Sequence, residues 1–223
     1  MAEQGAHPHQ RDHERPLLLE SQSGIPALKW TLPEGYRGLI FDCDGTLVDS
    51  MPLHYQVWVT ILRRHGLDFT EARFYLWAGV PVEEIIRRLA TEKGLTVDAS
   101  AIAAERDAYF HSLPASELRP VTAVVDIARY FYRQLPMAVA TGSTQTSAEA
   151  SLRAIGILEL FDAVISSEDA GRPKPAPDVF LLAAERISVA PSHCVAFEDA
   201  DAGLQAALTA GMHAVDIRPW LER

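Results

Sequence analysis

Residues 39–50 read LIFDCDGTLVDS and place two carboxylates at the end of an apolar run. Residues 39–41 are a predicted buried strand, and Gly45 is the type of residue that ends one. Asp42 and Asp44 therefore lie at the carboxyl end of that strand. Two carboxylates this close repel each other and lose hydration on burial, so we expect a cation or a reaction to use them. The alternative is a polar loop in which one of the two acids caps a helix.

The composition is that of a soluble globular protein. The 223 residues are 48% hydrophobic and 22% charged, enough for one large domain or two small ones. With 20 Lys and Arg against 30 Asp and Glu, the net charge is −10, which disfavours nucleic acid and anionic membranes as partners. No apolar run has the length of a transmembrane helix or the character of a signal core, so we expect a cytoplasmic protein. The oligomeric state stays open, with a monomer favoured.

Cys43 and Cys194 are the only cysteines of the sequence, and both lie in or beside apolar runs. We therefore expect two buried free thiols in a reducing compartment.

Residues 1–34 are a predicted flexible N-terminal extension with three histidines whose spacing fits no defined metal site. We expect Trp30 and Tyr36 to pin the end of this extension onto the body.

Helical periodicity dominates residues 51–120. Apolar residues recur at helical spacing in three segments, 53–62, 85–89 and 98–111, and no strand pattern interrupts them. A helical block between a first strand and a later set of strands indicates an inserted subdomain. We therefore predict an inserted helical unit over residues 53–120 and an α/β core made of residues 35–52 and 121–223.

Strands and helices alternate after residue 120. The predicted strands are 137–140, 163–166, 194–197 and 214–217, and the predicted helices are 121–135, 144–155, 178–187 and 203–210. Such alternation is typical of a parallel sheet with helices on both faces. In open sheets of this kind, the ligand crevice lies outside the carboxyl ends of the strands.

The residues that follow the predicted strands are therefore the candidate site. They are Asp42 and Asp44, then Thr141, Gly142 and Ser143, then Lys174, and finally Glu198 and Asp199. A hydroxyl and backbone amides at a helix N-terminus suit a phosphate oxygen. Taken singly, each has another explanation. Thr141 could cap a helix, Lys174 could be a solvated loop charge, and the last two acids could lie in the first turn of a helix, where the helix dipole favours negative charge. Their coincidence at one edge predicts a single site.

These motifs resemble those of the haloacid dehalogenase-like phosphotransferases. Residues 42–48 are similar to the first motif of that family, Thr141 to the second, Lys174 to the third, and residues 198–199 to the fourth. The resemblance covers about residues 36–218 and implies a Rossmann-like core with a helical cap at residues 53–120. Within the family, the chain is most similar to the β-phosphoglucomutase-like branch, and in particular to its bacterial fructose-1-phosphate phosphatases.

The resemblance also implies roles for the site residues. Asp42 would be the nucleophile that forms an aspartyl-phosphate, and Asp44 would be the general acid and base. A Mg²⁺ ion would be held by the Asp42 carboxylate, the Asp44 main-chain carbonyl and Asp199, with Glu198 binding directly or through water. The phosphoryl oxygens would be held by Thr141, Gly142, Ser143 and Lys174.

His54 stands ten positions after Asp44, where similar phosphosugar enzymes have a histidine. It could orient Asp44 or contact the substrate. The alternative is a histidine on a helix surface or at an interface.

The expected cap loop bears on the type of reaction. Mutases of this branch carry a Lys and an Arg around a Gly-Val pair, whereas here Gly79 and Val80, our tentative substrate contacts, are flanked by Ala78 and Val82. Without those cations, the second phosphate of a bisphosphate has no evident charge partner, unless two arginines further along the segment replace them.

We therefore predict a Mg²⁺-dependent phosphatase for a small phosphorylated metabolite, a sugar monophosphate with fructose 1-phosphate as the first candidate. One alternative is a β-phosphoglucomutase-type enzyme. A further alternative is a catalytically silent binding or regulatory module on the same fold.

Overall fold

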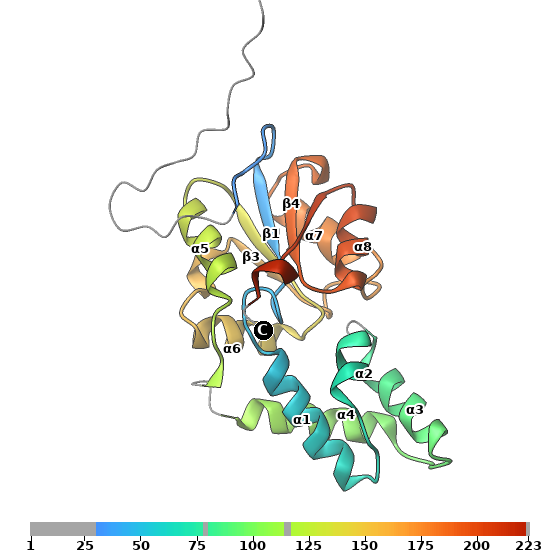
Figure 1. The fold of residues 1–223 in the computed structure, drawn as a ribbon. Helices are drawn as coiled ribbons and strands as arrows, with labels where there is room; N and C mark the ends of the chain where they lie inside the picture. The colour runs from blue at the N-terminus through green and yellow to red at the C-terminus, as the bar shows by residue number, and fades with distance from the viewer. Residues whose placement is uncertain (1–29, 78–79, 114–116, 222–223) are drawn as a thin grey trace, which may run out of the picture.

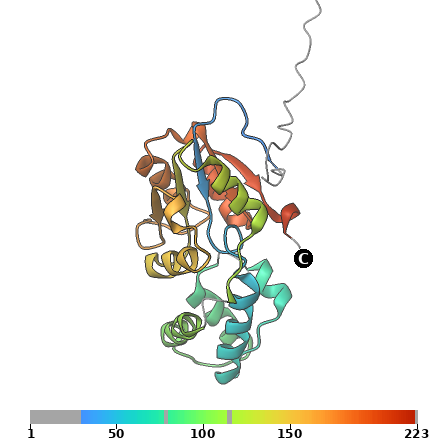
Figure 2. The same ribbon diagram turned by 90° about the vertical axis from the view of Figure 1, so that its left-hand side faces the viewer.

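The computed structural model describes residues 30–77, 80–113 and 117–221. A sheet flanked by helices forms one part of the molecule, and a group of helices forms the other, as Figure 1 shows. Figure 2, turned by 90°, shows the helical part lying below one edge of the sheet. The fold is thus the predicted α/β fold with a Rossmann-like parallel sheet.

The sheet is fully parallel in the described chain. Its strands are β1 (Gly38–Phe41), β2 (Met137–Ala140), β3 (Ala163–Ile165), β4 (Cys194–Glu198) and β5 (His213–Asp216), in the spatial order β3-β2-β1-β4-β5. Each lies within one or two residues of a predicted strand. The first strand is therefore central, with β2 and β4 as its neighbours, and the carboxyl ends of these three strands meet at one edge.

Helices cover both faces of the sheet. They are α5 (Thr122–Phe131), α6 (Gln145–Ala154), α7 (Asp178–Arg186) and α8 (Asp201–Thr209). The prediction that the first of them reaches residue 135 is wrong. Helix α5 ends at Phe131 because Arg133 adopts the left-handed backbone region, with φ 62°, which a right-handed helix excludes.

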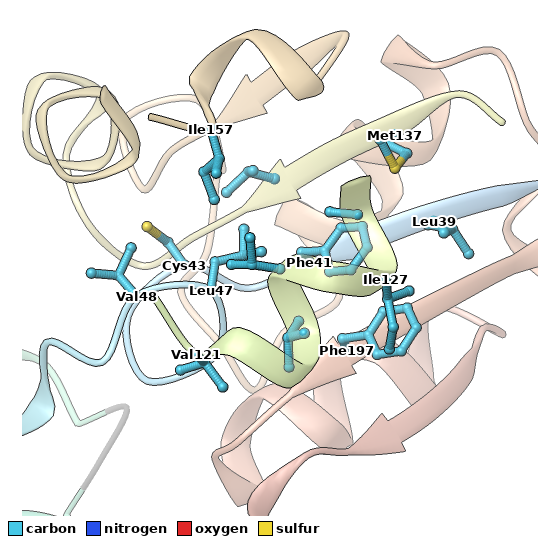
Figure 3. Close-up of a cluster of buried hydrophobic side chains, with 14 of the residues drawn as sticks. Leu39, Phe41, Cys43, Leu47, Val48, Val121, Ile127, Met137, Ile157 and Phe197 are labelled. Carbon is cyan, nitrogen blue, oxygen red and sulfur yellow. The ribbon is translucent and has the colours of Figure 1, made fainter. Parts of the chain in front are cut away.

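Strand alternation divides the core into two clusters. Leu39 and Phe41 of β1 pack with Ile127 of α5 on one face, whereas Ile40 packs with α7 and α8 on the other. Figure 3 shows the first cluster, in which Phe41, Ile127 and Phe197 lie together and Cys43 joins the apolar side chains. Both cysteines are buried and free, as predicted.

The helical part has its own hydrophobic cluster. Its helices within the described residues are α1 (Met51–Arg64), α2 (Glu71–Leu76), α3 (Val82–Glu92) and α4 (Ala99–Ser112). The sequence predicted three of them and missed α2. That helix has only six residues, too few for a clear periodic signal, and is begun by Thr70, whose hydroxyl accepts a hydrogen bond from the Arg73 N–H.

Two short segments connect the parts and run side by side. The Asp49 N–H donates to the Arg119 carbonyl at 2.8 Å, and the Val121 N–H donates to the Leu47 carbonyl at 2.9 Å. Helix α1 begins at Met51, so a boundary after residue 52 falls in its first turn. The division into a core and an inserted cap remains our proposal.

The last residues of the N-terminal extension pack on the core. The Trp30 ring lies edge-on to Phe197, with centroids 5.0 Å apart, and the Tyr36 ring lies 5.5 Å from His213. The two aromatic residues thus contact the body as predicted, and Leu32 adds to the contact. None of the helices in the described chain combines the length and the apolar character needed to cross a membrane.

Candidate active site

The predicted residues meet where β1, β2 and β4 end. Asp42 directly follows β1, Thr141 directly follows β2, and Glu198 is the last residue of β4. Lys174 reaches the same edge from the loop before α7. Asp42, Thr141 and Glu198 are almost fully buried, so their polar groups depend on one another rather than on water.

Lys174 links two of the carboxylates. Its Nζ donates to Asp42 Oδ1 at 2.7 Å and to Glu198 Oε1 at 2.5 Å, and it lies 4.9 Å from the ring centroid of Phe180. Burial alone would lower the pKa of Lys174, but the charges of Asp42 and Glu198 outweigh it and raise the pKa. The lysine is therefore a permanent cation at the centre of the site.

Asp42 is surrounded by other acids. Burial raises the pKa of its carboxyl well above the usual range, the Lys174 charge opposes that shift, and the charges of Glu198 and Asp199 add to it. A cation placed among these acids would favour ionised Asp42. The ionisation of Asp42, the nucleophile proposed from the sequence, thus depends on the charges around it.

Asp44 has the opposite environment. Its carboxylate accepts hydrogen bonds from Ser50 Oγ at 2.7 Å, from Ser143 Oγ at 2.6 Å and from His54 Nε2 at 3.3 Å. Burial raises its pKa, but the hydrogen bonds from His54, Ser143 and Ser50 outweigh burial and hold the pKa well below its usual range. Asp42 and Asp44, two residues apart, are thus pushed in opposite directions, a pattern typical of groups with different catalytic roles.

His54 joins Asp44 to Arg106, a residue that the sequence analysis missed. Arg106 Nη2 donates to His54 Nδ1 at 2.8 Å. Because a guanidinium can only donate, Nδ1 must accept, and the proton of a neutral imidazole then sits on Nε2, which faces Asp44. The buried His54 ring also stacks on Phe110 at 4.2 Å. His54 therefore lies at the site and not on a helix surface.

Aromatic rings hold Arg106 in place. Its guanidinium carbon lies 5.3 Å from the ring centroid of Trp58 and 6.0 Å from that of Phe110, and Nη1 donates to Asp107 at 2.6 Å. No pattern in the sequence indicates this contact, because Arg106 and His54 belong to different helices and are 52 residues apart.

An acidic group able to hold a metal ion lies at the same edge. Carboxylate oxygens of Asp42, Glu198 and Asp199 lie within 4.8 Å of one another, and Thr46 Oγ1 donates to Asp199 Oδ1 at 3.1 Å. Gly45, with φ +89°, passes so close that a Cβ there would lie 2.3 Å from Asp199 Oδ2. Oxygen donors of this kind suit Mg²⁺. The Asp44 main-chain carbonyl, the remaining predicted ligand, belongs to the same loop.

Glu198 is the most constrained of these acids. Besides the bond from Lys174, its Oε2 accepts from the N–H groups of Asp199 and Ala200, both at 2.9 Å. Its two oxygens are thus engaged by protein donors, which fits a metal contact through water better than a direct one.

The predicted phosphate-binding residues follow β2. Thr141 Oγ1 accepts a hydrogen bond from the Ser143 N–H at 3.0 Å, and a Cβ at Gly142 would have no heavy atom within 4 Å, so this turn borders open space. The Ser143 hydroxyl donates to Asp44 and not into that space. Ser143 thus ties this turn to Asp44, and phosphate binding by Thr141 and Gly142 stays a prediction.

The cap loop is described in part. Gly79 and Ala78 lie outside the described residues. Val80 packs against the hydrophobic cluster of the helical part. The guanidinium carbons of Arg73 and Arg88 lie 5.3 and 5.7 Å from the ring centroid of Trp77. Whether Gly79 and Val80 touch a substrate stays a prediction.

The two arginines that could replace the mutase cations are engaged elsewhere. Arg87 forms an ion pair with Glu83 and lies 3.7 Å from Glu84, and Arg88 pairs with Glu84 at 2.9 Å. Their charges are therefore balanced along the exposed face of α3.

Comparison with known proteins identifies the family of the chain. Residues 36–211 match a family model described as haloacid dehalogenase-like hydrolase. The chain is 40% identical over 185 residues to the fructose-1-phosphate phosphatase YqaB of Escherichia coli K12, covering 83% of this chain and 98% of that protein. It is 28% identical to a β-phosphoglucomutase of Bacillus subtilis, covering 81% and 83%. A β-phosphoglucomutase structure from Clostridium difficile superposes with a TM-score of 0.70 at 22% identity, covering 81% and 84%.

Proposed function

Because the chain belongs to the haloacid dehalogenase-like hydrolases, we propose that this phosphoric monoester hydrolase acts on a small sugar monophosphate in a Mg²⁺-dependent reaction. The observation that carries the proposal is the convergence of Asp42, Asp44 and Lys174 with the acids that end β4. Fructose 1-phosphate is the first substrate to test, because a relative with 40% identity is a fructose-1-phosphate phosphatase.

The proposed reaction has two displacements. An oxygen of Asp42 attacks phosphorus, the bond from phosphorus to the sugar oxygen breaks, and that oxygen takes a proton from Asp44. Because hydrogen bonds keep Asp44 ionised in the free protein, Asp44 has to take up this proton when the negatively charged substrate binds beside it. A water then attacks the aspartyl-phosphate, Asp44 takes its proton, and inorganic phosphate leaves with the Asp42 carboxylate restored. The hydrogen bonds from Ser50, Ser143 and His54 hold Asp44 in place for both transfers.

Cations carry the rest of the proposed chemistry. Lys174, fixed between Asp42 and Glu198, would contact a phosphoryl oxygen and offset its charge. Asp42, Asp199 and the Asp44 carbonyl, with Glu198 behind them, would hold Mg²⁺, which when bound offsets the repulsion between an anionic nucleophile and a phosphate dianion.

A mutase is the second candidate, since a relative with 28% identity is a β-phosphoglucomutase. The cap loop argues against it. Val82 stands where the mutases of this branch have a cation, and Arg87 and Arg88 pair with glutamates. In the described part of this segment, the second phosphate of a bisphosphate would therefore lack a positively charged partner.

The test is release of inorganic phosphate from a panel of sugar phosphates, with Mg²⁺ and with EDTA. We expect hydrolysis only with the metal, and a loss of at least about 10³-fold in Asp42→Asn, since the nucleophile is removed. Asp49→Asn is the matched control, because Asp49 is an exposed acid of the same loop. Full activity of Asp42→Asn would refute the nucleophile. Faster isomerisation of β-glucose 1-phosphate than hydrolysis would favour the mutase, and ligand binding without turnover would favour a silent module.

A further inference from the structure

Phe197 of β4 is surrounded by aromatic rings from distant parts of the chain. The Phe41 ring stacks on it with centroids 4.8 Å apart and an angle of 8°. The Trp30 ring meets it edge-on at 5.0 Å and 81°, and the Trp220 ring lies 6.4 Å away. Phe197 and Phe41 are fully buried, so these contacts fix the position of the Phe197 ring.

This ring pair lies directly behind the acidic edge. Phe41 and Phe197 are register partners in the sheet, and each immediately precedes a carboxylate of the site, Asp42 and Glu198. Side chains alternate along a strand, so the rings point into the core while the same backbone carries the acids. A shift of either ring therefore moves the backbone on which the carboxylates are held.

Trp30 stands outside the part of the chain that matches the family model, which begins at residue 36. Besides Phe197, it contacts Phe131 at the end of α5, with ring centroids 6.3 Å apart. We propose that Trp30 is a positioning residue, which holds Phe197 and through it the end of β4 in the arrangement that binds the cation. This inference rests on the proposed function, because it concerns the same metal site.

The expected effect follows from packing. Removal of the indole leaves space beside Phe197, and neighbouring groups relax partly into such a space. Groups that support metal ligands typically change metal affinity by about 10- to 100-fold when they are removed. Trp30 acts through one intervening ring, so we expect Trp30→Ala to weaken Mg²⁺ binding by about threefold to tenfold, below that range.

The experiment is calorimetric titration of the full chain with Mg²⁺, alongside thermal unfolding. We expect weaker binding in Trp30→Ala and near-normal binding in Trp30→Phe, which keeps an aromatic edge against Phe197. Tyr132→Ala is the control, because Tyr132 is 37% exposed and follows the same helix α5. A Trp30→Ala protein with a lowered Tm and unchanged Mg²⁺ affinity would reduce Trp30 to a stabilising contact and overturn the proposal.

Two further variants separate the possible failures. If the wild type binds no Mg²⁺, the proposed function fails. If binding is present, is lost in Asp199→Asn and is unchanged in Trp30→Ala, only the role of Trp30 fails. Should Trp30→Ala not fold, Trp30→Leu fills part of the space and decides the question, since unchanged affinity in that variant also overturns the proposal.

Discussion

Gly203→Ala is the substitution for which the structure predicts the sharpest conflict. Gly203 lies near the start of α8 and faces Glu198. A Cβ at this position would lie 1.7 Å from Glu198 Oε1 and 2.0 Å from its Cδ, where real Cβ contacts essentially never fall under 3.0 Å. Glu198 cannot move aside without loss, because it accepts hydrogen bonds from Lys174 and from the N–H groups of Asp199 and Ala200.

The magnitude follows from three terms. Alanine gains about 1 kcal/mol over glycine inside a helix. Overpacking costs about 2 kcal/mol, and a lost hydrogen bond to a charged group costs about 2 kcal/mol more. The free energy of unfolding should therefore fall by about 3 kcal/mol. In a protein of this size, such a change lowers Tm by roughly 6–12 °C.

The assay is thermal unfolding followed by circular dichroism, with phosphate release measured at a temperature where the variant is folded. Activity should also fall, because a displaced Glu198 no longer holds Lys174. Gly171→Ala is the control, since the nearest heavy atom to a Cβ there is Asp178 Oδ1 at 4.0 Å. A Gly203→Ala protein with the Tm and activity of the wild type would show that Glu198 is not held against α8 as described.

Arg106→Met should lower turnover about tenfold with little change in KM, because the variant releases His54 and lets Asp44 move. Arg106→Lys, which keeps a donor, should recover part of that loss, and full turnover in Arg106→Met would contradict the role. Burial raises the pKa of the Cys43 thiol well above its usual value and that of Cys194 to about 11, so neither should react with iodoacetamide at pH 8 until the chain unfolds. Since the unfolded chain releases the Cys194 proton first, the free energy of unfolding should also fall between about pH 9 and 11, more in the wild type than in Cys194→Ala.

The parts of the fold that follow from local patterns could be predicted. The run before Asp42 has strand length, and a parallel sheet requires alternation with helices, so the positions after each strand fall at one edge. Lys174 could be placed near Asp42 because both follow strands of that sheet, although the contact spans 132 residues. Topology, rather than any single residue, made these predictions possible.

Contacts between helices could not be predicted in the same way. Arg106 and His54 sit on different helices, and periodicity gives the buried face of a helix but not its partner. Helix α2 was missed because six residues carry too few apolar repeats. Ser143 was expected at the phosphate, but the orientation of its hydroxyl depends on the position of Asp44, which only the folded chain defines.

The distribution of charge explains why the nucleophile and the cation should act together. Four acids lie at one edge of the sheet, namely Asp42, Asp44, Glu198 and Asp199. The Lys174 side chain contacts two of them, Asp42 and Glu198. Because burial and then the charges of Glu198 and Asp199 raise the pKa of Asp42 against the effect of Lys174, its ionised form needs further positive charge. A phosphate dianion entering beside Thr141 increases that need. Substrate and metal ion should therefore favour each other's binding. The acids that repel one another in the free protein are those that hold the metal ion whose charge the reaction uses.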